Sequence, residues 1–477
     1  MTPLIQECSV LLSPEGVMAS LWNQPGAMLL RSVLFRSKAE RYSFVLANPF
    51  WIFHSRNTQC NLWAPSGITS FQGNPWEILD RLIQPFVTLE SENSPFPLGG
   101  CFGYWGYDLK SFVESRAPRW KANDLETPDC HVGFYNSLLV FDHHLQKQFI
   151  VATGLDSDGR CTMERAVHQT EFWRETIRQG AELAIRSPNP KVVNGLTSNL
   201  SREQYIRRVE QAQCFIKQGD IYQVNIAQRL HARHGRSSPE VFLNLLKHSP
   251  APFSAYLNCG DFQIVSSSPE SFLRMSGNRI RTRPIKGTRP RHVDPTRDAQ
   301  LTYELQTSSK EMAELVMITD LLRNDLGKIC EYGSVQVPEL VRLERYPQVQ
   351  HLVSTVEGTL SKNTSHLAAL KSCFPGGSIS GAPKLRATQI IDELETLARG
   401  PYTGALGYLG FNRESQISMI IRTAVCKGSE AWFHVGAGIV ADSQPTAEYE
   451  ETLAKAAGLC AAFFDESPPK ITHEPSP

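Results

Sequence analysis

The segment Ala405-Leu406-Gly407-Tyr408-Leu409 begins a run of three strand-like stretches that decides the fold class. Residues 417–421 (ISMII) and 432–435 (WFHV) follow it, and no helical pattern separates the three. Parallel strands need a long crossover, usually a helix, whereas antiparallel neighbours can be joined by short turns. The chain therefore lacks the βαβ rhythm of a doubly wound sheet. We expect an α+β fold in which large mixed or antiparallel sheets pack as a sandwich with helices outside.

Two regions and a short tail follow from the pattern along the chain. Up to about residue 190, β-like runs such as Tyr42 to Ala47 alternate with turns, and a charged helical stretch then runs from about Cys161 to Ile185. Prolines at 188 and 190 break that helix, so we place a boundary near residue 190. We assign residues 1–190 to a β-rich N-terminal region, 191–466 to a second region and 467–477 to a tail that we expect to be disordered.

Helices and further strands are expected in the second region. Ser201 and Gln204 form a capping box, and Gly219 suits the C-terminal cap of the helix that follows it. Further helices are predicted over about Tyr303 to Leu326, Lys384 to Leu397 and Thr446 to Phe464, and a strand over Phe262 to Val265.

The overall composition excludes several classes of protein. The 477 residues include 48 Lys and Arg against 48 Asp and Glu, so the formal net charge is zero, which argues against a general nucleic-acid binder. No apolar run approaches the roughly 18 residues of a membrane span, and the first basic residue is Arg31. Eleven cysteines without a C-x-x-C pair favour reduced thiols. We expect a cytoplasmic protein with neither membrane nor nucleic acid as a partner.

The loop Arg281-Thr282-Arg283-Pro284-Ile285-Lys286-Gly287-Thr288-Arg289-Pro290-Arg291 places one lysine among four arginines. A lysine amine must be neutral to attack carbon, and nearby positive charge and partial burial both favour the neutral form. Lys286 is therefore a candidate nucleophile. The alternative is a basic surface loop that binds phosphate.

A glutamate upstream of this loop is a candidate general acid. Glu270 follows Ser266-Ser267-Ser268-Pro269 at the end of a β-like run. A strand-end glutamate is commonly a solvated turn residue, but an enclosed one would have a raised pKa and could donate a proton.

Two pairs of glutamates lie three residues apart on predicted helices, Glu311 with Glu314 and Glu448 with Glu451. Each pair projects from one helical face. If the two helices met, four carboxylates without His or Cys nearby would suit a hard cation, which we take to be Mg²⁺. Separately, each pair is an ordinary solvated helix face. Lys455 lies one turn after Glu451 and could be its surface partner or meet an anion beside the metal.

Two glycine-rich stretches imitate nucleotide sites. Gly436-Ala437-Gly438-Ile439-Val440-Ala441 fits G-x-G-x-x-A after a predicted strand, but the next helix is delayed and no βαβ unit surrounds it. Its exposed amides could hold a carboxylate instead. The stretch from Gly376 to Lys384 (GGSISGAPK) departs from a P-loop, because Pro383 stands directly before Lys384 and Leu385 replaces the Ser or Thr that follows the lysine. We interpret it as a loop entering a helix whose free amides could face an anion.

Taken in order, these segments resemble the chorismate-utilising enzymes. The resemblance spans most of the chain and rests on Leu29-Leu30-Arg31-Ser32, residues 99–104 (GGCFGY), Ser268-Pro269-Glu270, Pro284-Ile285-Lys286-Gly287-Thr288, residues 320–327 (DLLRNDLG), residues 376–384 and the helix with Glu448. It implies a chorismate-binding catalytic region over 191–466, behind a region similar to the N-terminal part of anthranilate synthase large subunits.

The same resemblance implies roles for individual residues. Glu314 and Glu451 would bind Mg²⁺ directly, and Glu311 and Glu448 mainly through water, so that the ion bridges them to the ring carboxylate of chorismate. The residues expected to contact the substrate are Tyr402 and Arg422 at the enolpyruvyl carboxylate, the amides around Gly436 and Gly438, His351 in the pocket and Lys455 near the metal.

Lys286 distinguishes the branches of the family. Anthranilate synthases resemble this pattern with alanine there, whereas aminodeoxychorismate synthases carry lysine. Gln223 stands where isochorismate synthases have a water-activating lysine, which argues against water as the nucleophile. The resemblance implies that Lys286 attacks C2 of chorismate, that Glu270 protonates the leaving C4 hydroxyl, and that ammonia then gives 4-amino-4-deoxychorismate for folate synthesis. A separate glutamine amidotransferase subunit would supply the ammonia.

Three readings remain open at this point. The first is chorismate amination at C4, the second is an anthranilate synthase component I of tryptophan synthesis, and the third is a non-catalytic protein that binds anions or nucleic acid through the arginines. Ser32 marks a possible tryptophan site, where Arg31 replaces the glutamate that anthranilate synthases typically show. That replacement argues against feedback inhibition and leaves open a structural tryptophan.

Overall fold

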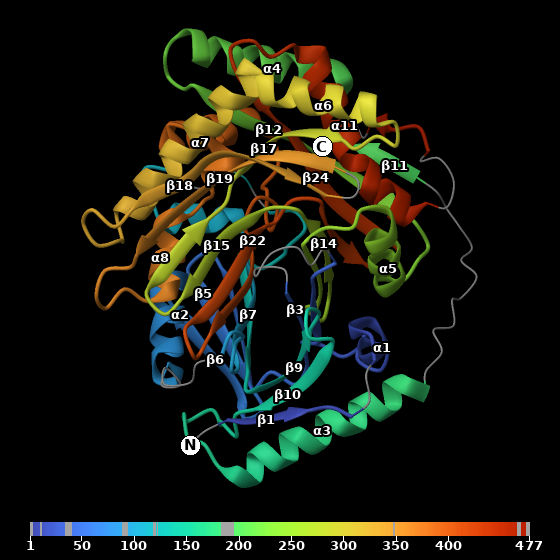
Figure 1. Cartoon of the computed structure of the whole chain (residues 1–477), viewed down its shortest axis with the longest axis vertical. Helices are drawn as coiled ribbons and strands as arrows, with labels where there is room; N and C mark the ends of the chain where they lie inside the picture. Colours follow the sequence, from blue (N-terminus) through green and yellow to red (C-terminus); the bar gives the residue numbers. More distant parts are fainter. Residues whose placement is uncertain are drawn as a thin grey trace.

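The structure of the chain, a computed structural model, describes residues 3–9, 12–33, 41–87, 94–117, 121, 123–182, 195–346, 349–464 and 469–473. Two large β-sheets face each other in the described residues, and helices cover their outer faces (Figure 1). The expectation of an α+β sandwich is confirmed.

The first sheet is built from both ends of the chain. Its strands pair in the order β1 (Leu4–Glu7), β10 (Lys147–Ala152), β9 (Ser137–Asp142), β3 (Tyr42–Leu46), β2 (Met28–Arg31), β13 (Phe253–Asn258), β14 (Gln263–Ser268), β23 (Thr423–Lys427), β24 (Glu430–Ile439), β12 (Gln223–Arg233), β11 (Gly195–Ser198) and β25 (Thr472–His473), with β20 (Gly381–Ala382) on β12. All described pairs are antiparallel except β11 with β25.

The second sheet carries the lysine loop at one end. Its order is β17 (Ile285–Pro290), β19 (Val349–Thr359), β16 (Arg279–Thr282), β15 (Ser271–Ser276), β22 (Glu414–Met419), β21 (Ala405–Gly410), β7 (Gly100–Trp105), β8 (Cys130–Tyr135), β4 (Trp51–Arg56), β5 (Gln59–Ala64) and β6 (Gly67–Gln72), with β18 (Gln336–Arg345) on β19. The three strand-like stretches of residues 405–435 are divided between the sheets. Strands β21 and β22 lie in the second sheet, and β24 lies in the first.

The main core lies between the two sheets. Buried residues such as Leu46 and Leu138 of the first sheet pack with Phe53, Phe102 and Val132 of the second. Fully burying such a side chain stabilises the fold by roughly 1.5–3 kcal/mol. The outer face of the first sheet forms a second core with α1 (Pro14–Met18), α3 (Met163–Glu182), α5 (Ser238–His248) and α11 (Pro445–Phe463).

The remaining helices close the ends and the second sheet. They are α4 (Arg202–Lys217) and α10 (Lys384–Leu394) beside β12, α6 (Pro295–Thr307) and α7 (Ser309–Gly327) over β17 and β19, and α2 (Pro75–Ile83), α8 (His366–Cys373) and α9 (Gly377–Ser380), with short 3₁₀ turns at Gln84–Phe86 and Tyr107–Phe112. The predicted capping box of α4 is confirmed, and Gly219 after it has φ +83°.

Two expectations need correction. The single helix predicted from Tyr303 to Leu326 is two helices, because Ser308 is extended (φ −68°, ψ 105°) and its hydroxyl caps α7 at the amide of Glu311. Within the tail that we expected to be disordered, Thr472 and His473 form β25 on β11. The boundary predicted near residue 190 lies outside the described residues.

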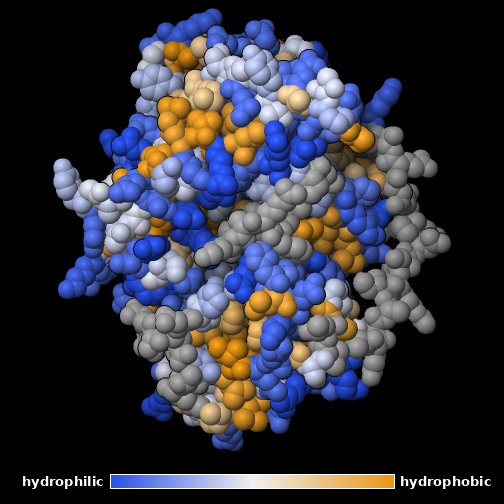
Figure 2. Space-filling model, viewed as in Figure 1, coloured by the Kyte–Doolittle hydropathy of each residue, from blue (hydrophilic) through white to orange (hydrophobic). Residues whose placement is uncertain are grey.

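The surface mixes hydrophilic and apolar residues, as expected from an ordinary globular composition. On the face in view, apolar residues form separate patches among hydrophilic ones (Figure 2). Among the described residues, no helix has the length and apolar character that crossing a membrane requires.

Candidate active site

A cavity of about 690 Å³ opens among β17, β19, β24, α7 and α11. A volume of this size suits a small-molecule ligand. The cavity is lined by all the predicted site residues except Ser32, namely Glu270, Lys286, Glu311, Glu314, His351, Tyr402, Arg422, Gly436, Gly438, Glu448, Glu451 and Lys455. Segments up to about 180 residues apart in sequence therefore meet at one place.

Lys286 reaches this cavity from an irregular strand. The pairing of β17 with β19 shifts register between Lys286 and Thr288, and Gly287 between them has φ +67°. The Nζ atom of Lys286 lies 3.8 Å from Oε2 of Glu314, and both side chains are largely buried. The candidate nucleophile is thus held next to a carboxylate of α7.

Gly287 favours this close approach. A Cβ atom there would lie 2.7 Å from Cδ1 of Leu305 and 3.1 Å from Oε2 of Glu311. Because real Cβ contacts are longer, glycine lets α6 and α7 pack directly over β17.

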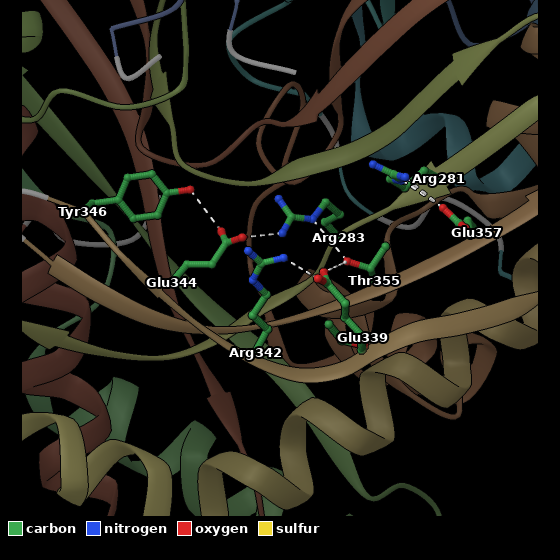
Figure 3. A network of polar contacts seen from close by, with 9 residues as sticks. Arg281, Arg283, Glu339, Arg342, Glu344, Tyr346, Thr355 and Glu357 are labelled. Atoms are coloured by element: carbon green, nitrogen blue, oxygen red, sulfur yellow. Dashed lines mark hydrogen bonds and ion pairs between the residues drawn. The ribbon is translucent and has the colours of Figure 1, made fainter. Parts of the chain in front are cut away.

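The four arginines around Lys286 do not act as we expected. Arg281 and Arg283 do not line this cavity and instead pair with Glu357 and Glu344, as Figure 3 shows for the two pairs. Arg289 lies 3.3 Å from Glu311, and Arg291 lies 2.9 Å from Asp298. Since each guanidinium is neutralised by a carboxylate, the arginines do not supply the positive field that the sequence argument gave to Lys286.

Glu270 is enclosed, as the general-acid hypothesis required. It follows β14 and is only 7% exposed. Burial raises the pKa of this carboxyl, and a hydrogen bond with Ser378 and the charge of Lys286 offset part of that rise. A carboxyl with a raised pKa can hold a proton to donate.

The four glutamates of α7 and α11 each have a cationic neighbour. The distances from nitrogen to carboxylate oxygen are 3.8 Å for Lys286 and Glu314, 3.3 Å for Arg289 and Glu311, 3.7 Å for Lys310 and Glu448, and 2.7 Å for Lys455 and Glu451.

Burial and mutual repulsion act on these carboxylates. Burial raises the pKa of Glu314 and of Glu448, and the charge of a neighbouring glutamate adds to each rise. Burial alone would also raise the pKa of Glu451, but Lys455 lowers it below its usual value. Two helices therefore direct coupled negative charges into one cavity.

The chemistry of this donor set fits Mg²⁺, which prefers carboxylate oxygens. Glu314 of α7 and Glu448 of α11 line the same cavity, and the charge of Glu448 raises the pKa of Glu314, which favours a cation between the helices. Among the described residues, however, no three acidic, His or Cys side chains are already gathered as a metal cluster. Three lysines and Arg289 pair with these carboxylates instead.

The opposite wall of the cavity offers a free cation. Arg422, at φ +51°, has no ion pair within the described part of the chain, and burial lowers the pKa of its guanidinium. An unpaired buried charge is costly, so this side chain is suited to an anionic ligand.

Tyr402 and His351 are fixed beside Arg422. The ring of Tyr402 stacks on His434 at 5.0 Å, and a Cβ on Gly436 would lie 3.0 Å from the Tyr402 hydroxyl. His351 shares a 2.8 Å hydrogen bond with Thr288, and burial together with Arg422 lowers its pKa to about 4. The imidazole is therefore neutral near pH 7.

The glycines of β24 make room for the ligand. Gly438 pairs with Asn225 of β12, and a Cβ on Gly438 would lie 2.5 Å from Nε2 of Gln223 and 3.9 Å from Nζ of Lys286. Both glycines lie inside a strand of an antiparallel sheet, so the rejection of a dinucleotide site holds. Lys455 donates a hydrogen bond of 2.9 Å to the carbonyl of Gly436.

Ser32 is separate from this cavity. It lines a pocket of about 40 Å³ between the sheets, and its hydroxyl is buried without a hydrogen-bond partner among the described residues. Arg31 beside it is held 2.6 Å from Glu15. The possible tryptophan site at Ser32 stays a prediction, in a pocket separate from the active-site cavity.

Sequence reasoning missed several cavity residues. Ser378 contacts Glu270, Thr288 contacts His351, and Lys310 lies beside Glu448. Ser378 and Thr288 belong to the motifs at residues 376–384 and 284–288, so their place in the site could have been predicted from the sequence. Lys384 of the glycine-rich stretch, by contrast, turns to Asp325 and the carbonyl of Cys373 and braces α7 instead of meeting a ligand.

The family of the chain is shown by its sequence. The profile of the chorismate binding enzyme family matches residues 30–461, which is most of the chain. The chain belongs to this family. The cavity that gathers the predicted residues is therefore the candidate active site of a chorismate-binding enzyme.

Similar proteins come from two groups within this family. The chorismate-binding enzyme described here is 38% identical to anthranilate synthase component 1 of Acetivibrio thermocellus, over 91% of this chain and 89% of the relative. It is 36% identical to aminodeoxychorismate synthase component 1 of Escherichia coli K12, over 93% and 97%.

Solved structures share the fold. Anthranilate synthase component I from Streptococcus pneumoniae TIGR4 superposes with a TM-score of 0.77 at 30% identity, over 88% of this chain and 92% of that one. MenF, the menaquinone-specific isochorismate synthase of Escherichia coli, has a TM-score of 0.70 at 19% identity, over 97% and 95%, and supports the fold alone.

Proposed function

We propose that this chorismate-binding enzyme aminates chorismate at C4 to give 4-amino-4-deoxychorismate, as the first component of an aminodeoxychorismate synthase. The observation that carries the proposal is Lys286, which lines the same cavity as the enclosed Glu270 and the unpaired Arg422. Relatives named for either reaction are similarly close, so the choice between them rests on this lysine.

Three side chains would orient the substrate. The guanidinium of Arg422 pairs with the enolpyruvyl carboxylate, and the hydroxyl of Tyr402 beside Gly436 donates to it. The neutral imidazole of His351, positioned by Thr288, faces the same side. Glu311, Glu314, Glu448 and Glu451 would hold Mg²⁺, which supplies positive charge to the ring carboxylate.

The covalent step uses the lysine and the buried acid. The Nζ atom of Lys286 forms a bond to C2, the ring double bonds shift, and the C4 hydroxyl departs as water after taking a proton from Glu270. Ammonia then bonds to C4, the C2–N bond breaks and Lys286 is restored. The net reaction is chorismate plus ammonia giving aminodeoxychorismate plus water, and the enolpyruvyl group is retained.

The ammonia source would be a second subunit. Relatives of both kinds are named component 1, which supports a partner. We propose a glutamine amidotransferase as that partner and p-aminobenzoate for folate synthesis as the end of the route.

Product analysis tests the proposal. The purified chain is incubated with chorismate, Mg²⁺ and an ammonium salt, and the products are separated by chromatography with mass detection. Aminodeoxychorismate without pyruvate is expected. Anthranilate with pyruvate would instead assign the chain to the tryptophan branch, and an absence of turnover would contradict both activities.

A further inference from the structure

A second cavity of about 560 Å³ lies beside the active-site cavity. Its walls come mainly from β15, β16, β18 and β19, and it shares Pro269 and Ile285 with the active site. The volume is in the range of roughly 300–1,000 Å³ that small-molecule sites occupy. No residue assigned to the reaction above lines it.

The wall between the two cavities contains the neighbours of the nucleophile. Ile285 precedes Lys286 on β17 and pairs with Val353, which faces the second cavity. The ring of Tyr346, on the second cavity, contacts that of His351, on the active site, at 5.7 Å. A ligand in the second cavity would therefore press on the strand that holds Lys286.

The charge on these walls is positive. Four guanidinium groups line the cavity, those of Arg274, Arg279, Arg281 and Arg283, against the carboxylates of Glu344 and Glu357. Arg281 lies 2.9 Å from Glu357, and Arg283 pairs with Glu344, which also accepts a hydrogen bond of 3.1 Å from the hydroxyl of Tyr346 (Figure 3). Both acids are therefore used within the wall.

Two cations are left over. Arg274 and Arg279 form no ion pair or side-chain hydrogen bond within the part of the chain that the structure describes. Arg274 is half-buried on β15, and the carboxylate that acts on it electrostatically is Glu414, which accepts a hydrogen bond from Ser276. Arg279 is exposed, so Arg274 is the partly desolvated guanidinium without a partner, and such a group favours an anion and opposes a cation such as ammonium.

The rest of the lining is apolar and partly aromatic. Phe253, Ile280, Ile285 and Val353 face the same space, together with the ring of Tyr346. A flat apolar ring could lie against these side chains while its charged group meets the free arginines. Ligand pockets are commonly lined in this way, with apolar walls and a few polar groups that orient the ligand.

From this arrangement we propose that the second cavity is a binding site for a small aromatic carboxylate, held by Arg274 and Arg279 with its ring against Phe253, Ile280 and Val353. A carboxylate can take two parallel hydrogen bonds from one guanidinium, so the two arginines together can satisfy both of its oxygens. The site is distinct from the one at Arg422, although the two share a wall.

The test uses 4-fluorobenzoate as the probe and its ¹⁹F resonance as the readout. Titrations are made with Arg422→Gln, so that the guanidinium of the active site cannot bind the probe. Saturable binding is expected in this variant. Adding Arg274→Gln and Arg279→Gln should weaken it by about tenfold or more, because hydrogen bonds to charged groups are lost. Adding Arg207→Gln, an exposed arginine of α4, should leave binding within twofold of the starting variant.

A labelling experiment keeps the outcome clear if the combined variant does not fold. The unaltered chain is irradiated with 4-azidobenzoate, and the labelled peptides are sequenced by mass spectrometry. Labels are expected within residues 271–283 or 334–346, which hold no residue that lines the active-site cavity. The proposal is overturned if Arg422→Gln abolishes probe binding, if the two cavity arginines can be replaced without effect, or if the label falls only on α7 and α11.

Discussion

Nζ of Lys286 and Oε2 of Glu314 lie 3.8 Å apart, with both side chains largely buried. This contact joins β17 to α7 and sets the nucleophile beside a candidate ligand of the metal. It also means that the amine faces a carboxylate rather than the arginines of its own loop.

Replacing the lysine tests its role directly. Lys286→Ala should reduce formation of aminodeoxychorismate by more than about a thousandfold, since it removes the amine that is proposed to bond to C2. In the unaltered chain, an adduct derived from chorismate should be found on the peptide that contains residue 286. If the adduct persists after the substitution, Lys286 is not the nucleophile. Lys310→Ala, a neighbouring lysine of the same cavity, is the matched comparison and should form the adduct normally.

Glu270 should act only when it is protonated. Because burial raises its pKa, the rate should fall as the pH rises through that raised value. Glu270→Gln should lose about 10²–10⁴-fold in rate, the usual contribution of a general acid. Rates are measured from pH 6 to pH 9. A variant that keeps its rate and its pH profile would exclude Glu270 from proton transfer.

The same residue gives a stability signature. A carboxyl whose folded pKa is raised contributes stability that is present at low pH and is lost as the pH rises through the folded value. Compared with Glu270→Gln, the unaltered apoprotein should therefore lose stability more steeply toward alkaline pH. Urea unfolding at several pH values measures the difference, and parallel curves would count against burial of an ionisable group.

The dependence of activity on Mg²⁺ should change when a glutamate that lines the cavity is replaced. Glu451→Gln removes a proposed ligand and should raise the Mg²⁺ concentration for half-maximal activity by about tenfold or more. Glu450→Gln is the control and should change little, because Glu450 does not line the cavity and lies 3.9 Å from Arg202. Equal behaviour of the two variants would place the metal elsewhere.

Gly287 should be intolerant of a side chain. Gly287→Ala adds strain at φ +67° and a clash with Leu305 and Glu311, so it should cost about 1–3 kcal/mol of stability and disturb α7. Gly260→Ala is a matched control, because Gly260 also has a positive φ of +88° but no atom within 4 Å of the added methyl. Chemical denaturation of both variants separates the clash from the backbone strain.

Acid should unfold the protein through its buried histidines. Burial lowers the pKa of His366 to about 4 and that of His131 to about 3. Between these values and about 6.5, the unfolded chain binds more protons than the folded one, so stability should fall as the pH falls through this window. Urea midpoints at pH 7 and pH 5 measure the effect. His366→Gln should reduce the pH dependence even though it removes hydrogen bonds to Ser415 and Gly277.

Local patterns in the sequence predicted much of the structure. Glu311 with Glu314, and Glu448 with Glu451, could be placed on one helix face because residues three apart are neighbours on a helix. The absence of helices between β21 and β22 correctly indicated antiparallel pairing.

Features that depend on tertiary contacts could not be predicted from spacing. Arg281 and Arg283 are paired with Glu357 and Glu344, which lie far along the chain, so the charge around Lys286 could not be judged from its loop. The unpaired state of Arg422 likewise depends on which side chains fold near it. The break at Ser308, by contrast, had a local signal, since Ser308 and Glu311 fit the S-x-x-E spacing of a helix start.

The way the two sheets are assembled has a consequence for synthesis on the ribosome. Strand β2 pairs with β13, and β7 pairs with β21. In each sheet, therefore, a strand that is synthesised early pairs with one that is synthesised much later. Until Phe253–Asn258 and Ala405–Gly410 have emerged, two hydrogen-bonding edges of the nascent chain stay open, and open edges invite pairing with other chains. Production of this enzyme should therefore depend on chaperones that shield its first 150 residues.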